Sequence, residues 1–221
     1  LYLVSFIREG LVRQDAQTGH YGLGSFAIQL GHSAIRQVDI VEVARDELGV
    51  LQSATGFAAY LSLWGNRGPG IVSKVDGHRQ GSLAVRLGYV LPLSASATGQ
   101  VFLAWLERSE TRRVLDDEIQ IARHSEENWT IAPELIRDPA ALEALIDTVR
   151  ARGFATSKNN INANFAAMAA PVFDHSGRIA AAVTVLGSDK TMTGARARTV
   201  TAALLDTTGR LSRRLGYSPR G

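Results

Sequence analysis

Cysteine is absent from the sequence. Without it the chain can form no disulfide bond, no thiolate metal site and no cysteine nucleophile. Apolar runs are also short, and none approaches the ~18 residues that a membrane-spanning helix needs. No signal-peptide pattern is found at the start of the chain. These absences lead us to expect a cytoplasmic protein with no membrane partner.

Sequence motifs of catalysis and cofactor binding are missing as well. The chain has no Walker-type phosphate loop, no dinucleotide fingerprint and no nucleophile elbow. Its carboxylate clusters, Asp116-Asp117-Glu118 and Glu126-Glu127, lie in polar stretches that are typical of a solvated surface. The five histidines are far apart in the sequence, and none has a partner four residues away: His20, His32, His78, His124 and His175. We therefore expect neither a catalytic site nor a metal or cofactor site.

The composition of the 221 residues is that of an ordinary globular protein, with 45% apolar and 20% charged residues. The formal net charge is +3. A small basic surplus permits binding to nucleic acid, but it is equally common in proteins that have no such partner. Composition alone therefore does not decide between these functions.

The stretch from Phe165 to Gly187 is the most strongly patterned part of the sequence. Two short apolar runs flank the polar turn Asp174-His175-Ser176-Gly177-Arg178, which predicts a β-hairpin. Both faces of the first run are apolar, so this strand should be covered on both sides and lie at the centre of a domain. Most side chains here are small, and Thr184 adds one hydroxyl. Such a surface suits a small-molecule pocket or close helix packing, and the hairpin alone favours packing.

Hydrophobic periodicity and turn signals predict the elements around this hairpin. Residues 25–36 should form a helix that is apolar on several sides and therefore buried, for instance against a partner chain. The stretch 154–164 is polar, and its asparagine-rich part, residues 159–164, predicts a polar loop, with a ligand lining as the alternative. Strands are expected at 57–64, 71–75 and 82–86, and further helices at 41–51, 100–106, 109–123, 139–152 and 194–215. This order predicts an α+β domain with an antiparallel sheet flanked by helices.

Several motifs together resemble the IclR family of bacterial transcriptional regulators. Residues 6–15 and 18–24 are similar to the end of that family's recognition helix and to its wing. Residues 92–100, PLSASATGQ, with Leu103-Ala104, resemble the family segment P-hydrophobic-H-A-S-A-x-G-K…LA. Residues 152–155, RGFA, and 169–174, AAPVFD, match a third landmark. The order and spacing of these motifs agree with the family along almost the whole chain.

The resemblance implies a winged helix-turn-helix that binds operator DNA, a linker helix and a GAF-like effector-binding domain, assembled as a homodimer or homotetramer. Residues 1–24 would then be the C-terminal remnant of the winged helix-turn-helix, 25–38 the linker helix and 39–221 the effector domain. Candidate contacts to DNA phosphates are Arg8, Arg13 and His20, although each fits a solvated surface position equally well.

The resemblance also implies a small-molecule effector bound between the sheet and the helix that follows residues 92–99. Carried over position by position, the effector site comprises Ala97, Thr98, Ser157, Ala167, Thr184 and Leu186. The backbone N–H groups of Ala97 and Thr98 can hold a carboxylate. This chain has Ser94 and Gln100 where the family has His and Lys, and residues 157–160 lack the family's acidic character. We therefore expect an effector with an anionic or polar head and an apolar, aromatic or aliphatic body.

Two other classes of protein fit a similar α+β scaffold. The first is a small enzyme, against which the missing nucleophile–base arrangement counts. The second is a purely structural dimerisation module, for which the sheet face should be filled and without a pocket.

Overall fold

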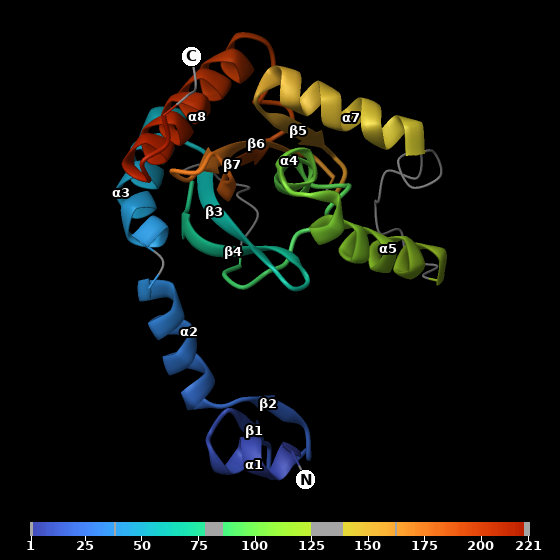
Figure 1. Cartoon of the computed structure of the whole chain (residues 1–221). Helices are drawn as coiled ribbons and strands as arrows, with labels where there is room; N and C mark the ends of the chain where they lie inside the picture. Colours follow the sequence, from blue (N-terminus) through green and yellow to red (C-terminus); the bar gives the residue numbers. More distant parts are fainter. Residues whose placement is uncertain (1, 38, 78–85, 125–138, 162, 219–221) are drawn as a thin grey trace. The chain divides into compact units, whose positions relative to one another are not determined.

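The computed structural model describes residues 2–37, 39–77, 86–124, 139–161 and 163–218 (Figure 1). The chain separates into two compact units, residues 1–42 and 43–221. Helix α3 (Asp39–Thr55) runs across this division. The boundary that we expected after residue 38 therefore falls at the start of α3, a few residues before the division between the units.

The first unit contains helix α1 (Tyr2–Arg8), the short antiparallel pair of β1 (Val12–Gln14) and β2 (Tyr21–Leu23), and helix α2 (Ser25–Gln37). A helix end and a hairpin, the parts that the IclR resemblance implies for residues 6–24, are both present. Asp15 shapes the hairpin turn, because its Oδ1 accepts hydrogen bonds from the N–H groups of Gln17 and Thr18, at 2.9 and 2.8 Å. Chiefly the bond from Thr18, followed by that from Gln17, lowers the pKa of the Asp15 carboxyl.

Apolar residues of α2 are exposed in the single chain. Phe26 and Ile28 are 38% and 61% exposed in the single chain. Hydrophobic periodicity reports that a face is apolar but not what covers it, so burial of these residues against a partner chain stays a prediction.

The second unit is built on a five-stranded antiparallel sheet in the order β4-β3-β7-β6-β5. The predicted hairpin forms its centre, with Ala167 opposite Leu186 and Ala170 opposite Val183. The turn is closed by Asp174, whose carboxylate accepts the N–H of Ser176 at 2.8 Å. The strands are β3 (Ala58–Gly65), β4 (Gly68–Val75), β5 (Ala155–Lys158), β6 (Phe165–Phe173) and β7 (Ile179–Ser188).

Helices cover both faces of this sheet (Figure 1). Helix α8 packs against β6 and β7, and α3 lies beside it. On the other face α4 packs against β5, β6 and β7, and α7 packs against α4. The bounds are α4 (Ala97–Trp105), α5 (Arg108–His124), α7 (Pro139–Arg152) and α8 (Gly194–Arg214). The α+β architecture with an antiparallel sheet flanked by helices is confirmed.

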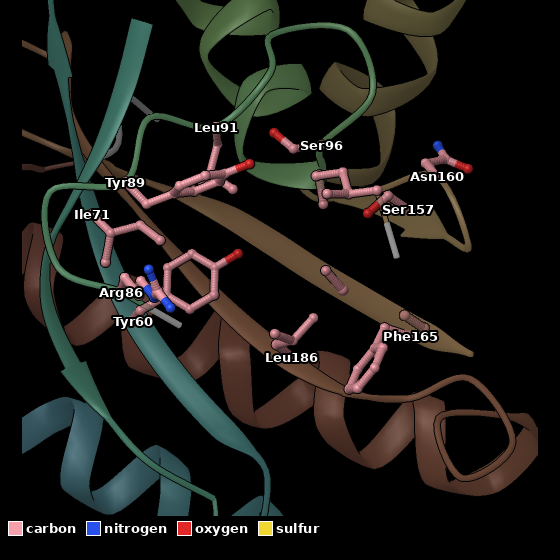
Figure 2. A pocket seen from close by; sticks show the side chains of 14 residues that line it. Tyr60, Ile71, Arg86, Tyr89, Leu91, Ser96, Ser157, Asn160, Phe165 and Leu186 are labelled. Atoms are coloured by element: carbon pink, nitrogen blue, oxygen red, sulfur yellow. The ribbon is translucent and has the colours of Figure 1, made fainter. Parts of the chain in front are cut away.

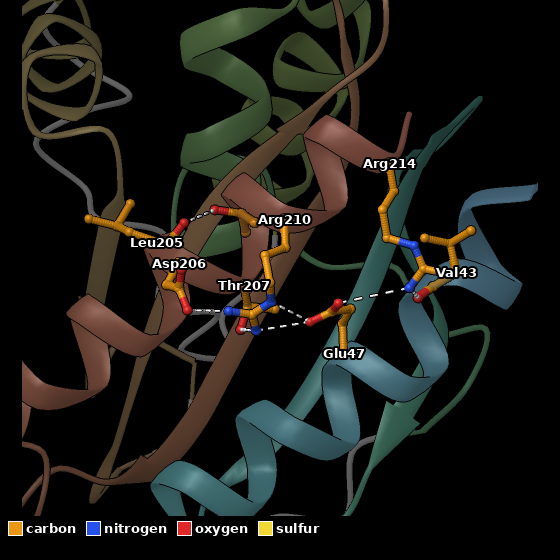
Figure 3. A network of polar contacts seen from close by, with 8 residues as sticks. Val43, Glu47, Leu205, Asp206, Thr207, Arg210 and Arg214 are labelled. Atoms are coloured by element: carbon orange, nitrogen blue, oxygen red, sulfur yellow. Dashed lines mark hydrogen bonds and ion pairs between the residues drawn. The ribbon is translucent and has the colours of Figure 1, made fainter. Parts of the chain in front are cut away.

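Helices α3 and α8 are joined by a polar network centred on Glu47 (Figure 3). The Glu47 carboxylate accepts a hydrogen bond from Arg210 Nε at 2.9 Å and pairs with Arg214 at 3.8 Å. Arg210 also pairs with Asp206, one helical turn before it. The Glu47 side chain is only 13% exposed, so its ion pairs are less screened than those of an open surface. Ala44, Leu48 and Leu51 of α3 are fully buried, which agrees with the helix predicted there from hydrophobic periodicity.

Three local predictions need correction or lie outside the description. Residues 155–158 form the edge strand β5, which their polar composition did not predict. Helix α4 begins at Ala97 and not at Gln100, because Ser96 caps it. The third strand predicted at 82–86 lies outside the described residues except for Arg86.

Candidate ligand-binding site

A cavity of about 310 Å³ lies between the sheet and the start of α4 (Figure 2). Its walls come from β3, β4, β5, β6 and β7, from the loop before α4 and from the turn between β5 and β6. The lining residues are Tyr60, Ile71, Arg86, Tyr89, Leu91, Ser96, Ala97, Ser157, Asn160, Ile161, Phe165, Ala166, Ala167 and Leu186.

The N-terminus of α4 forms one polar part of the cavity wall. Ser96 is the N-cap, and its Oγ accepts the N–H of Gly99 at 2.8 Å while it donates to the carbonyl of Pro92 at 2.6 Å. The N–H groups of Ala97 and Thr98, in the first turn of α4, have no acceptor within the helix. The helix dipole adds partial positive charge at the same end. This end of α4 therefore favours a negatively charged or polar ligand group.

Arg86 is a second feature that favours an anion. It is the one cationic side chain among the described lining residues, and that lining contains no acidic side chain. In Figure 2 Arg86 lies at one end of the cavity, and the polar side chains of Ser157 and Asn160 lie toward the other. The rest of the lining is largely apolar and aromatic, with Tyr60, Tyr89 and Phe165 as its rings. The cavity thus has a cationic side chain at one end, the N-terminus of α4 toward the other end and an apolar body between them.

Two threonines lie beside the cavity without being part of its lining. Thr98 and Thr184 are both fully buried, and their hydroxyls share a hydrogen bond of 2.8 Å. The hydroxyl of Tyr60 belongs to the same cluster: burial raises its pKa, and hydrogen bonds to Thr98 and Thr184 lower it in part. This cluster joins α4 to the sheet and orients the Tyr60 ring that lines the cavity.

Glu118 of α5 holds the loop before α4 in place. Its carboxylate accepts the N–H of Leu93, and it accepts the N–H and the hydroxyl of Ser94 at 3.3 and 3.4 Å. Burial raises the pKa of the Glu118 carboxyl, although the bonds from Leu93 and Ser94 act in the opposite direction. The residues that precede the α4 N-terminus are therefore anchored by a largely buried carboxylate.

The family model described as "Bacterial transcriptional regulator IclR C-terminal" matches residues 32–213. The chain belongs to the IclR family. HmgR of Pseudomonas aeruginosa is 33% identical and has a TM-score of 0.72, with 99% of this chain and 84% of that chain covered. A putative IclR regulator from Silicibacter sp. TM1040 is 25% identical and has a TM-score of 0.81, with coverage of 98% and 82%. The HTH-type transcriptional regulator BhcR of Paracoccus denitrificans is 29% identical, over 99% of this chain and 75% of its own length.

These comparisons confirm the resemblance to IclR regulators and the expectation of a regulator in place of an enzyme. Membership of the family implies that the protein binds DNA and responds to an effector. Within the described ranges, no helix is both long and apolar enough to cross a membrane. In the same residues no group of three His, Cys, Asp or Glu side chains could hold a metal ion.

The effector-site residues inferred from the IclR resemblance fall into two groups in the structure. Ala97, Ser157, Ala167 and Leu186 line the cavity together. Thr98 and Thr184 instead form the buried hydroxyl pair beside it. The assignment of these six residues to an effector remains a prediction.

Sequence reasoning missed most of the lining, including Tyr60, Arg86 and Tyr89. The asparagine run gave one usable signal. Asn160 lines the cavity, and its amide donates to the carbonyl of Ala95 at 3.2 Å, which ties the β5–β6 turn to the loop before α4. Asn159 and Asn164, in contrast, adopt left-handed backbone conformations with φ of 59° and 67° and shape the turn, as a polar loop requires.

The candidate DNA-binding residues all lie in the first unit and are exposed. Arg8 ends α1, Arg13 is in β1, and His20 directly precedes β2. Arg13 and the turn next to His20 therefore belong to one hairpin, as expected for a wing. Their contact with DNA remains a prediction.

The raised pKa of Glu118 gives a testable dependence on pH. Between the unfolded value of 4.5 and the higher folded value, the folded protein binds more protons than the unfolded chain, so rising pH removes stability. The free energy of unfolding of the wild type should therefore fall relative to Glu118→Gln as pH rises through this window, and the difference should then become constant. Urea denaturation of both proteins from about pH 4 to about pH 8 measures it.

Glu118→Ala is the second variant in this experiment. It leaves the N–H groups of Leu93 and Ser94 without their acceptor, so we expect a loss of about 1–3 kcal/mol at every pH. Parallel curves for the wild type and Glu118→Gln would contradict the raised pKa, and an unchanged stability of Glu118→Ala would contradict the anchoring role.

Proposed function

We propose that this IclR-family regulator binds a small organic acid in the cavity beside α4, and that binding changes its affinity for operator DNA. The observation that carries the proposal is the combination of Arg86 and the N-terminus of α4 with an apolar, aromatic lining. A carboxylate pairs with Arg86 at one end of the cavity, the N-terminus of α4 favours a polar group toward the other end, and an aromatic or aliphatic body fills the space between them. The open cavity also argues against a purely structural module with a filled sheet face.

The volume of the cavity limits the size of the effector that it can hold. Its volume of about 310 Å³ is at the lower end of the ~300–1,000 Å³ that is usual for ligand pockets. We therefore expect acids with a single ring or a short chain. Ser157 and Asn160 offer hydrogen bonds to a second polar group on the effector, away from Arg86.

The regulator acts on DNA through the first unit in this proposal. Residues 1–24 would contribute the wing, with Arg8, Arg13 and His20 near DNA phosphates, residues 25–38 the linker helix and residues 39–221 the effector domain. The exposed apolar side chains of α2, Phe26, Ile28 and Leu30, support a homodimer or homotetramer in which a second copy covers them. We place this activity in the cytoplasm, where operator DNA is found.

Coupling between effector and operator requires two arrangements of the oligomer with different affinities for the acid. By linkage, an acid that weakens DNA binding tenfold is itself bound tenfold more weakly by the DNA-bound form. The proposal therefore predicts a reciprocal effect that can be measured from either side.

The test uses the complete gene product. Monocyclic aromatic and short aliphatic carboxylates are screened by thermal shift, and each hit is added to a mobility-shift assay with DNA from upstream of the gene at moderate salt. At least one acid should raise the melting temperature and change DNA retardation. If no acid does so with protein that retards DNA, the effector assignment is wrong, and if active protein retards no DNA, the operator assignment is wrong.

Arg86→Gln refines the test, with the exposed Arg67→Gln in the β3–β4 turn as the matched control. Loss of a charged hydrogen bond is worth about 1.5–3 kcal/mol, so the affinity for a hit should fall about ten- to hundredfold in Arg86→Gln only. The uncharged amide of the same acid should bind both variants equally. An equal loss for acid and amide would contradict a role of Arg86 in binding the carboxylate.

A further inference from the structure

A second hollow of about 490 Å³ lies on the opposite side of the β5–β6 pair from the effector cavity. It is an open groove between the end of α7, the edge strand β5, β6 and the first half of α8. It shares no lining residue with the cavity beside α4. The groove is therefore a separate feature of the effector domain.

The floor of the groove is apolar and held in place. Phe154 and Leu205 contribute to it, and Leu205 is 37% exposed despite its size. Met168 of β6 is buried at the base, where its sulfur accepts a hydrogen bond from the Thr201 hydroxyl at 3.4 Å. An exposed leucine over an ordered apolar base offers a surface that a hydrocarbon body can cover.

Two arginines give the groove its charge. Arg152, the last residue of α7, and Arg198 of α8 both line it, and both are exposed. Within the part of the chain that the structure describes, neither has an ion-pair partner, whereas Arg108 and Arg210 each pair with a glutamate. The lining contains no acidic side chain among those residues. The groove thus carries uncompensated positive charge beside an apolar floor.

The groove and the effector cavity share one pair of strands. Thr156 is paired with Met168, and both line the groove. The next pair, Ser157 with Ala167, lines the cavity. Because successive side chains of a strand point to opposite faces, the two sites are separated by a single layer of backbone. A ligand that shifts β5 against β6 on one side therefore changes the shape of the site on the other.

We propose that this groove is a second ligand site, which binds an amphipathic carboxylate such as a medium-chain fatty acid. The carboxylate pairs with Arg152 and Arg198, and the hydrocarbon chain covers Phe154, Met168 and Leu205. Charge complementarity selects this occupant, because an apolar floor alone would take an uncharged body equally well. The ligand also changes the affinity of the effector cavity through β5 and β6, and this second part rests on the proposed function.

Decanoate is the probe, and isothermal titration calorimetry with the complete gene product, below the micelle-forming concentration, is the measurement. Arg152→Glu/Arg198→Glu should weaken binding by at least tenfold. The matched control is Arg213→Glu, an exposed arginine of α8 outside the groove, which should stay within about twofold of the wild type. If the double variant melts at a lower temperature, Arg198→Gln takes its place, with a loss of at least threefold expected.

Ala167→Trp separates the two sites, because its side chain projects into the effector cavity. Decanoate should still bind this variant, with an affinity that differs from that of the wild type by no more than the severalfold coupling between the two sites. If Ala167→Trp abolishes decanoate binding and the arginine variants do not, decanoate occupies the effector cavity and the groove proposal is wrong. Absence of decanoate binding by the wild type overturns it as well. Neither result affects the proposed function, which depends on the acids found in the thermal-shift screen.

The coupling between the groove and the effector cavity is tested with an acid found in the thermal-shift screen. Saturating decanoate should change the affinity of the wild type for the acid at least threefold, and it should change nothing in the double arginine variant. An unchanged affinity in the wild type overturns the coupling and leaves the groove as a binding site alone.

Discussion

Gly99→Ala should destabilise the effector domain by about 3 kcal/mol or more, or prevent it from folding. A Cβ at this position would lie closer than 3.0 Å to the carbonyl oxygens of Pro92 and Leu93. Both obstacles are backbone atoms, so no side chain can rotate out of the way. The same loop is anchored by Glu118 and by the Ser96 cap, and its displacement would therefore break several hydrogen bonds together.

Gly49→Ala is the matched control for Gly99→Ala. Gly49 also lies within a helix, α3, but a Cβ there would meet no atom within 4 Å. Since alanine is favoured over glycine in a helix by about 0.8–1.0 kcal/mol, this variant should be as stable as the wild type or more stable. Urea denaturation of the three proteins provides the comparison. A Gly99→Ala variant that unfolds at the wild-type urea concentration would show that the loop does not pack on α4 as described.

Ala167→Trp should reduce the affinity for every acid found in the effector screen by at least a hundredfold, which corresponds to about 2.7 kcal/mol. Ala167 is on the floor of the cavity, opposite Leu186 in the β6–β7 ladder. An indole in place of its methyl group occupies space that the body of the acid needs. Because the cavity is empty space of about 310 Å³, the new ring has room and the domain should still fold.

Two further variants make the result interpretable. Ala167→Val should give a smaller, graded loss, and Ala195→Trp, at an exposed position in the first turn of α8, should give none. Affinity is measured by calorimetry, and the melting temperature checks the fold. If Ala167→Trp binds every acid as tightly as the wild type does, the cavity beside α4 is not the effector site.

The parts of the fold that could be predicted are those whose structure depends on residues close together in the sequence. The β6–β7 hairpin follows from two apolar runs and the turn at Asp174. Strand β5 could not be found in this way. It is short and polar, and it becomes a strand because its backbone pairs with β6, as in the pairs of Thr156 with Met168 and Ser157 with Ala167.

The same distinction holds for the candidate site. The family resemblance named Ala97, Ser157, Ala167 and Leu186 as site residues, and these four residues line one cavity. Tyr60 and Arg86 could not be predicted, because their place depends on the register of β3 with β7 and on the path of the chain after β4. Thr98 and Thr184 were expected as polar groups for a ligand. A sequence shows which residues carry a hydroxyl group but not which groups they bond. In the structure these two hydroxyls share a hydrogen bond.

The alanines of β6 have a consequence for the thermodynamics of binding. Alanine has no side-chain rotamers to lose, so the part of the floor formed by Ala166 and Ala167 is ordered before any effector arrives. Conformational entropy is lost only on the walls above it, where side chains such as Arg86 and Leu186 line the cavity, at ~0.5–1.5 kcal/mol for each flexible side chain that becomes fixed. The alanine floor is therefore rigid before binding. The affinity of an effector then depends on how few side-chain conformations of the wall residues are lost when the effector binds.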